Sequence, residues 1–130
     1  MRVTDASALI IALAGSSAHA RSLRERLRSE ALAAPHVVDL EVTNTLRRHV
    51  QGRRLSLADA EHALRELRLL NIDQHAHGPL LRRCWALREN VTPYDAAYVA
   101  LAEALGVPLL TADARLANAP GIRCEVELLT

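Results

Sequence analysis

Three aspartates in this chain stand where an extended or loop segment gives way to a helix. Asp5 follows the segment MRVT, Asp95 follows TPY, and Asp113 follows the apolar run VPLLTA. Taken singly, each is explained by helix capping, because an aspartate accepts hydrogen bonds from the free N–H groups of a first helical turn. Taken together they predict a site. If the strands before Asp5 and Asp113 are adjacent and parallel, both carboxylates emerge at one edge of a sheet, which the start of the Asp95 helix can also reach.

Carboxylates gathered in this way favour one kind of chemistry. At separations of about 4 Å to 6 Å they repel each other by roughly 1 kcal/mol per pair in water, and more where they are partly buried, so they need cations or protons beside them. Oxygen-only ligands select Mg²⁺ or Mn²⁺ over Zn²⁺. An Mg²⁺ ion held by carboxylates can activate a water molecule and stabilise charge on a phosphodiester, which is the chemistry of a nuclease.

The segment from Val91 to Leu116 carries the clearest signals for the elements that must position these acids. Thr92 suits an N-cap, Pro93 the first helical position, and Asp95 the third position of a capping box. The segment 96–105 is apolar on nearly every face and Gly106 follows it, which predicts a buried helix that ends there. The run 107–110 is typical of a short parallel strand, with another helix expected after Asp113.

The rest of the chain alternates in the same way. We expect a strand before Asp5 and a helix to about Ala14, and then further helices at 18–32, 39–51, 55–70 and 77–90. Short strands, or a turn in the first case, are expected at 35–38, 69–72 and 122–126. Val38, Val42, Leu46 and Val50 form an apolar stripe, as do Leu57, Ala60, Leu64 and Leu67, which leaves Glu61 outside. Alternating strands and helices predict an α/β sandwich around a small parallel sheet.

Composition limits the classes of protein to which the chain can belong. With 130 residues, half of them hydrophobic, it is long enough for one domain, 1–130, with a real core. Aromatic residues make up 2% and Phe is absent, so Leu, Val, Ile and Ala must fill the core, with Trp85 as its largest expected piece. Cys84 and Cys124 form no disulfide framework, which fits a reducing cytoplasm. No signal peptide and no run of transmembrane length is expected, and so no membrane association.

The charge pattern separates two populations. The net charge is +1, and all sixteen basic residues are Arg, so the chain is not a strongly basic nucleic-acid binder. Local arginines could still contact phosphates: Arg115 and the pairs Arg47-Arg48 and Arg53-Arg54, although solvated helix charges explain them equally well. Most glutamates are expected on solvated helix faces, beside arginines or water: Glu25, Glu30, Glu61, Glu66, Glu89 and Glu103.

Three segments, VTDASAL, DLEVTNTL and TPYDAAYVALAEALGVPLLTADARL, resemble the PIN-domain ribonucleases, specifically the VapC toxins of bacterial toxin–antitoxin pairs. The resemblance covers nearly the whole chain, and the last segment is its most specific part. By this resemblance the acidic site falls on Asp5, Glu41, Asp95 and Asp113. Ser7 and Thr111 match polar positions that support the acids, and Asn44 matches a common helix position.

The resemblance also implies a three-layer α/β/α PIN fold, endonucleolytic cleavage of RNA with Mg²⁺ or Mn²⁺, homodimerisation, and inhibition by a cognate VapB-like antitoxin. We expect Asp5, Asp95 and Asp113 to hold one metal ion, with Glu41 orienting or deprotonating the attacking water. Some relatives carry a further acid shortly after the position of Asp113. Here Ala114 and Arg115 follow, which leaves the number of metal ions open.

Other functions have weaker support. A haloacid-type phosphohydrolase would need a second aspartate where Ser7 stands, and a receiver domain would need a lysine, which the chain lacks. No GxGxxG, P-loop or HExxH motif is present. The alternative that stays open is a catalytically silent PIN-like module that binds a protein or RNA. The helices around Trp85 and at 57–67 could serve the core, a dimer contact or an antitoxin groove, and the core is favoured.

Overall fold

A five-stranded sheet crosses the middle of the molecule. The computed structural model describes residues 1–129, and the strand order in its sheet is β3-β2-β1-β4-β5. The strands are β1 (Arg2–Thr4), β2 (Leu32–Pro35), β3 (Ile72–His75), β4 (Leu109–Thr111) and β5 (Val126–Leu128). Each strand runs parallel to its neighbours. The expected adjacency of the first strand and the strand before Asp113 is confirmed, because Val3 pairs with Leu109 and Thr4 with Leu110.

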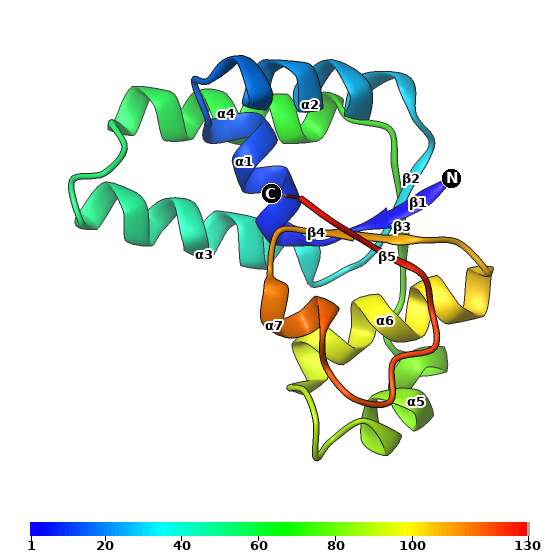
Figure 1. Cartoon of the computed structure of the whole chain (residues 1–130). Coiled ribbons are helices and arrows are strands. Elements are labelled where there is room, and N and C mark those ends of the chain that lie inside the picture. Colours follow the sequence, from blue (N-terminus) through cyan, green and yellow to red (C-terminus); the bar gives the residue numbers. More distant parts are fainter. Residues whose placement is uncertain (130) are drawn as a thin grey trace.

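Helices cover both faces of the sheet, as Figure 1 shows. Four helices pack around one another on one face: α1 (Ala6–Ala14), α2 (Ala18–Ser29), α3 (Val38–Gln51) and α4 (Leu57–Leu69). The other face carries the short 3₁₀ helix η1 (Gly78–Leu80) and three helices, α5 (Leu81–Ala86), α6 (Pro93–Leu105) and α7 (Ala114–Ala117). The three-layer α/β/α sandwich expected from the sequence is therefore confirmed. Helices α3 and α4 form a hairpin that extends past the sheet (Figure 1).

The core lies on both sides of β1 and β4. Val3, Leu109 and Leu110 have no exposed surface, as expected for central strands of a parallel sheet with helices on both faces. Helix α6 is buried from Ala96 to Ala102 and ends at Gly106, whose φ of +67° is the left-handed conformation that glycine adopts at no steric cost. Along α3, Val38, Val42 and Leu46 are buried as the predicted stripe requires.

Trp85 was expected to be the largest piece of the core, and that prediction is wrong. Its side chain lies on α5 and the residue is 69% exposed, whereas Tyr98 of α6 is the largest fully buried side chain. Helix α5 is shorter than the predicted helix at 77–90. Cys84 and Leu87 are the buried residues of this region, and Trp85, adjacent to Cys84, points to the other side of the helix. On α4, Leu57 is 63% exposed, and the buried face runs through Ala60, Ala63 and Leu67 instead.

Several boundaries also differ from those predicted. The second helix ends at Ser29 rather than Leu32, because Leu32 enters β2, which spans 32–35 where a strand or turn had been expected at 35–38. The third strand lies at 72–75 rather than 69–72, and the edge strand at 126–128 rather than 122–126. These strands have three or four residues, too few for a periodic pattern to fix their ends.

Half of the six glutamates expected on solvated helix faces are paired with arginines: Glu30, Glu66 and Glu103. Glu30 binds both Arg2 and Arg26, and although burial disfavours its charge, these hydrogen bonds hold its pKa below the ordinary value. Arg26 also binds Glu127 of β5 through two hydrogen bonds, which links α2 to the edge strand. Within residues 1–129, no helix combines the length and the hydropathy that crossing a membrane requires.

Candidate active site

Asp5 occupies the point where β1 ends and α1 begins. It is the N-cap of α1, with its Oδ1 accepting a hydrogen bond of 3.0 Å from the backbone N–H of Ala8. The Ser7 hydroxyl donates to the same oxygen at 2.7 Å, and the Thr111 hydroxyl donates to Oδ2. Asp5 is only 5% exposed, so its carboxylate depends on these three donors rather than on water.

Ser7 and Thr111 connect two separate segments of chain at this point. Each hydroxyl has a single proton, with which it donates a hydrogen bond to Asp5. Each hydroxyl oxygen also accepts a hydrogen bond from a backbone N–H. The N–H of Ala112 donates to Ser7 Oγ at 2.9 Å, and that of Asp113 donates to Thr111 Oγ1 at 3.0 Å. The end of β4 is thereby fixed to the start of α1, and both Ser7 and Thr111 contact the carboxylate of Asp5 directly.

Asp95 and Asp113 approach this edge from two other helix starts. Thr92 caps α6 as predicted, its Oγ1 accepting from the backbone N–H of Asp95 at 3.2 Å. Asp113 is the N-cap of α7, where its Oδ1 accepts from the N–H of Arg115 at 2.9 Å. Its side chain is 31% exposed, so it opens the site toward solvent.

Glu41, in the first turn of α3, brings the fourth carboxylate from the opposite helical layer. Its Oε1 accepts a hydrogen bond from the hydroxyl of Tyr98, which lies on α6 one turn beyond Asp95. Sequence reasoning missed Tyr98. The available signal was a phenol inside the otherwise small and aliphatic run 96–102 of α6, because a buried tyrosine hydroxyl requires a polar partner.

The electrostatics link these acids into one group. Burial raises the pKa of Asp5, and the nearby charge of Asp95 adds to this effect. Burial also raises the pKa of Glu41, with further contributions from Asp95 and Asp5. The pKa of Asp95 is raised by burial and by the charge of Asp113. Each carboxylate therefore loses hydration and faces another negative charge, which are the conditions that a bound cation relieves.

The donor set fits a hard divalent cation but is not closed around one. Carboxylate and hydroxyl oxygens are the ligands that Mg²⁺ and Mn²⁺ prefer. Within residues 1–129, however, no three acidic, His or Cys side chains converge closely enough to hold a metal ion as they stand. Two of the acids are engaged elsewhere, because Glu41 accepts from Tyr98 and Asp113 caps α7.

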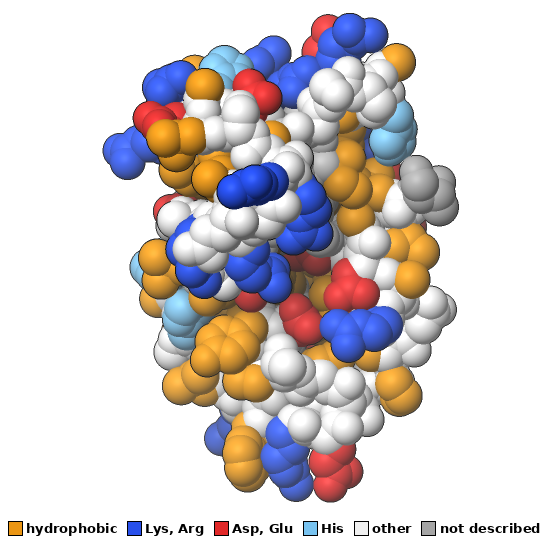
Figure 2. Space-filling view, turned by 90° about the vertical axis from the view of Figure 1, so that its left-hand side faces the viewer, with side chains coloured by type: hydrophobic (Ala, Val, Ile, Leu, Met, Phe, Trp, Pro, Cys, Tyr) orange, Lys and Arg blue, Asp and Glu red, His pale blue; other side chains and the backbone are white. Residues whose placement is uncertain are grey.

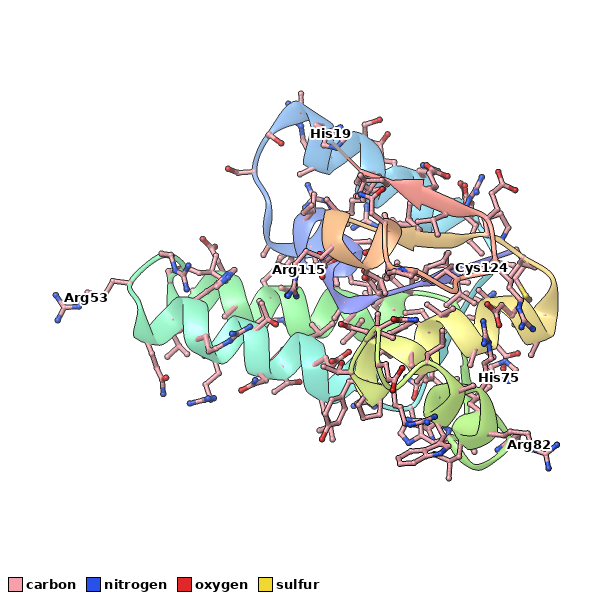
Figure 3. The ribbon with its side chains drawn as sticks, turned by 60° about the horizontal axis from the view of Figure 1, so that its bottom comes forward. His19, Arg53, His75, Arg82, Arg115 and Cys124 are labelled. Carbon is pink, nitrogen blue, oxygen red and sulfur yellow. The ribbon has the colours of Figure 1, made fainter. Side chains whose placement is uncertain are left out.

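Of the arginines predicted to contact phosphates, Arg115 lies beside the acids. Arg47 and Arg48 lie with Asn44 on another part of the surface. The Nη2 of Arg115 is 3.7 Å from Asp113 Oδ2, and the side chain is 90% exposed. Arg47 donates to Asn44 and Gln51, and Arg48 donates to Thr45, so these residues belong to the exposed face of α3. Arg53 lies at the tip of the α3–α4 hairpin, far from Arg115 (Figure 3). Figure 2 shows acidic side chains set in a hollow, with basic side chains around them.

A groove of about 750 Å³ leads away from the acids between α5, the start of α6 and α7. Asp95, Asp113 and Arg115 form part of its lining, and Trp85 and Arg88 line it as well. A ligand bound at the acids can therefore extend along a preformed channel.

Comparisons with known proteins agree with this geometry. The family model described as the PIN domain matches residues 2–122. Ribonuclease VapC1 of Mycobacterium tuberculosis is 49% identical over 128 residues, which are 98% of this chain and 96% of that protein.

Solved structures share the fold. That of PAE2754 from Pyrobaculum aerophilum has a TM-score of 0.70 at 29% identity, covering 96% of this chain and 81% of that one. VapBC2 from Rickettsia felis, solved bound to a promoter DNA fragment, has a TM-score of 0.70 at 13% identity, covering 99% and 98%. The match to the PIN family model and the identity to VapC1 over nearly the full length agree with the parallel sheet and its acidic edge: the chain belongs to the PIN-domain family, among the VapC ribonucleases.

Proposed function

We propose that this chain is the toxin of a toxin–antitoxin pair and cuts RNA phosphodiester bonds endonucleolytically with the help of Mg²⁺ or Mn²⁺. The observation that carries the proposal is the group of mutually repelling carboxylates at the end of β1 and β4, built from Asp5, Glu41, Asp95 and Asp113. It stands beside an open groove in a chain 49% identical to a ribonuclease.

Asp5, Asp95 and Asp113 are the residues that would hold the metal ion. A bound Mg²⁺ or Mn²⁺ ion supplies a water of lowered pKa and positive charge next to the phosphate. Asp5 is oriented before any ligand arrives, because Ser7, Thr111 and the N–H of Ala8 fix both of its oxygens. Preorganised carboxylates do not have to be reoriented as the reaction proceeds.

Glu41 is the group that takes or orients the proton of the attacking water. Its raised pKa brings its proton affinity closer to that needed near neutral pH. Tyr98 fixes one of its oxygens, Oε1, which leaves Oε2 to face the reaction. Arg115, exposed beside Asp113, is placed to contact a phosphate of the substrate. Arg47 and Arg48, on the outer face of α3, would contact RNA farther from the cut.

The alternative is a catalytically silent PIN-like module that binds RNA or protein. The observation that favours it is the lack, within the described residues, of three side chains already gathered at one metal position. The two functions differ in what the carboxylates do. Replacing the carboxylates with amides abolishes cleavage if the chain is a ribonuclease, and it leaves binding unaffected if the chain is only a binding module.

The deciding experiment compares Asp5→Asn and Asp95→Asn with Glu61→Gln, an exposed residue on α4, in cleavage of total cellular RNA with Mg²⁺ or Mn²⁺. Asparagine caps a helix as well as aspartate does, so the fold should survive. We expect each Asn variant to lose about a hundredfold or more of the cleavage rate, since substituting a residue that only hydrogen-bonds a metal ligand already reduces activity by about 10- to 100-fold. Full activity in both variants would contradict the proposal.

The assignment of the chain as a VapC-type toxin also predicts its partners. We propose a VapB-like antitoxin as the inhibitory partner, a homodimer as the assembled form, and the cytoplasm as the place of action. Free thiols at Cys84 and Cys124 are consistent with a reducing compartment. Co-expression with the product of the adjoining gene, followed by measurement of cleavage and of molecular mass, tests the first two proposals together.

A further inference from the structure

Trp85 is the only tryptophan in the chain, and most of its surface faces solvent. An exposed indole keeps a large, rigid apolar face in water, where it is available for a contact with a ligand. The residue is 69% exposed and lines the groove that leads to Asp95 and Asp113. The ribonuclease chemistry proposed above makes no use of this side chain.

Arg88 holds the indole in place. Its guanidinium carbon lies 4.7 Å from the ring centroid, and its Nη1 donates a hydrogen bond of 3.0 Å to the backbone oxygen of Trp85. The two side chains form one unit in which a cation covers part of an aromatic face. This unit presents both an aromatic surface for stacking and a positive charge.

The charges along the groove indicate what kind of ligand suits it. Two arginines, Arg88 and Arg115, face three carboxylates, Glu89, Asp95 and Asp113. A polyanion alone gains little from this balance, so phosphate contacts cannot supply all of the affinity. A planar base beside the phosphate adds affinity that the charges do not supply, because stacking on an aromatic ring does not depend on net charge.

We propose that Trp85 and Arg88 form a stacking site for an unpaired base of the RNA, next to the phosphodiester that the acids cleave. This inference rests on the proposed ribonuclease function and adds a binding position to it: one for a single unpaired nucleotide, formed by Trp85 and Arg88. A paired base is stacked inside its own helix and cannot reach the indole. Arg88 contacts the phosphate of the stacked nucleotide, and Arg115 contacts the one nearer the acids.

The single tryptophan makes the test direct. In the Asp5→Asn background, which binds RNA without cutting it, the emission of Trp85 is followed during titration with a random-sequence single-stranded oligoribonucleotide. We expect strong quenching by this RNA. Inorganic polyphosphate, a polyanion without bases, and a fully paired RNA duplex should leave the emission nearly unchanged.

Substitution provides the second measurement, which uses the anisotropy of labelled RNA. Trp85→Ala should weaken binding of the single strand by about tenfold or more, as expected from loss of a stacked base. Trp85→Phe keeps an aromatic face and should stay within about threefold of the parent. Leu69→Ala removes another exposed apolar side chain, on α4 away from the groove, and should have no effect.

Each outcome supports or overturns the stacking site. Unchanged affinity in Trp85→Ala, or RNA binding without quenching, overturns it. So does a Trp85→Ala variant that alters the oligomeric state while its RNA affinity stays constant, because the groove then contacts a second copy of the chain. Failure of the ribonuclease proposal is recognised separately, since it shows as an absence of cleavage by the parent protein whatever Trp85 does.

Discussion

The hydroxyl of Thr111, at the end of β4, donates its proton to the carboxylate of Asp5, at the end of β1. The same hydroxyl accepts the backbone N–H of Asp113. One small side chain therefore holds two of the candidate metal ligands in register, across a pair of strands that the sheet already places side by side.

Replacing Thr111 with Val should disturb both contacts. Valine has the same shape but no hydroxyl, so Asp5 loses a donor and the N–H of Asp113 loses its acceptor. We expect the free energy of unfolding to fall by about 1–3 kcal/mol, with a loss of RNA cleavage. Thr111→Ser keeps the hydroxyl and lacks only a methyl group, so it should retain most of the activity. The activity of each variant is divided by the fraction of it that is folded under the assay conditions. If the two corrected activities were equal, the hydroxyl would have no positioning role.

Stability should rise as the pH is lowered from neutrality. The pKa values of Asp5, Glu41 and Asp95 are raised by burial and by one another, so the folded protein binds protons that the unfolded chain releases. Where the folded state holds more protons, the free energy of unfolding increases as the pH falls. The window runs from neutral pH down to ordinary carboxyl values of about 4. Below it, acids of lowered pKa such as Glu30 and Glu127 lose their arginine pairs and stability declines.

Chemical denaturation across this range checks the prediction. Asp95→Asn removes one of the repelling charges, so it should be more stable than the parent at neutral pH. Its free energy of unfolding should also vary less with pH above the ordinary carboxyl pKa values. Glu61→Gln should follow the parent curve. A parent protein whose stability only decreases between neutrality and pH of about 5 would contradict the assignment of a repelling cluster.

Divalent cations should stabilise the parent protein. Mn²⁺ at about a hundred times its dissociation constant raises the free energy of unfolding by about 2.7 kcal/mol if it binds only the folded state. Thermal unfolding with and without Mn²⁺ measures this effect. Asp5→Asn and Asp95→Asn should lose most of the gain, while Glu61→Gln should keep it. An equal shift in all four proteins would place the bound metal somewhere other than these carboxylates.

Tyr98→Phe should change the pH dependence of cleavage. The hydrogen bond from Tyr98 lowers the pKa of Glu41 against the larger effect of burial, so its removal raises that pKa further. If Glu41 acts as the charged base, the acid limb of the cleavage profile moves to higher pH. Tyr94→Phe is the matched control, because Tyr94 is 60% exposed on the same helix. A profile that stays in place in Tyr98→Phe would remove Glu41 from the proton transfer.

Local signals in the sequence predicted the junctions that carry the acids. The caps at Asp5 and Thr92 and the stop at Gly106 depend on hydrogen bonds within a few residues, so the residue types alone indicate them. The pairing of β1 with β4 entered the sequence prediction only as a condition, namely that the two strands be adjacent and parallel, and the structure meets that condition. The grouping of the acids rested on this condition and on the resemblance to the VapC toxins.

Features that depend on distant contacts were not predicted. Tyr98 and Glu41 lie on helices in different layers, 57 residues apart, and nothing near either residue in the chain indicates the other. Trp85 was placed in the core because large aromatic residues are usually buried, but its exposure depends on which face of α5 packs against α6, and that face carries Cys84. The strand LAAP of β2 shows no alternation because both of its faces are buried, so its position could not be read from periodicity.

The bond between Thr111 and Asp5 joins residues 106 positions apart, so the site combines the beginning of the polypeptide with a segment near its end. During translation, Asp5 leaves the ribosome long before the strand that completes its surroundings has been synthesised. A nascent chain therefore has no assembled site while it is still being made, and a copy shortened before β4 never acquires one.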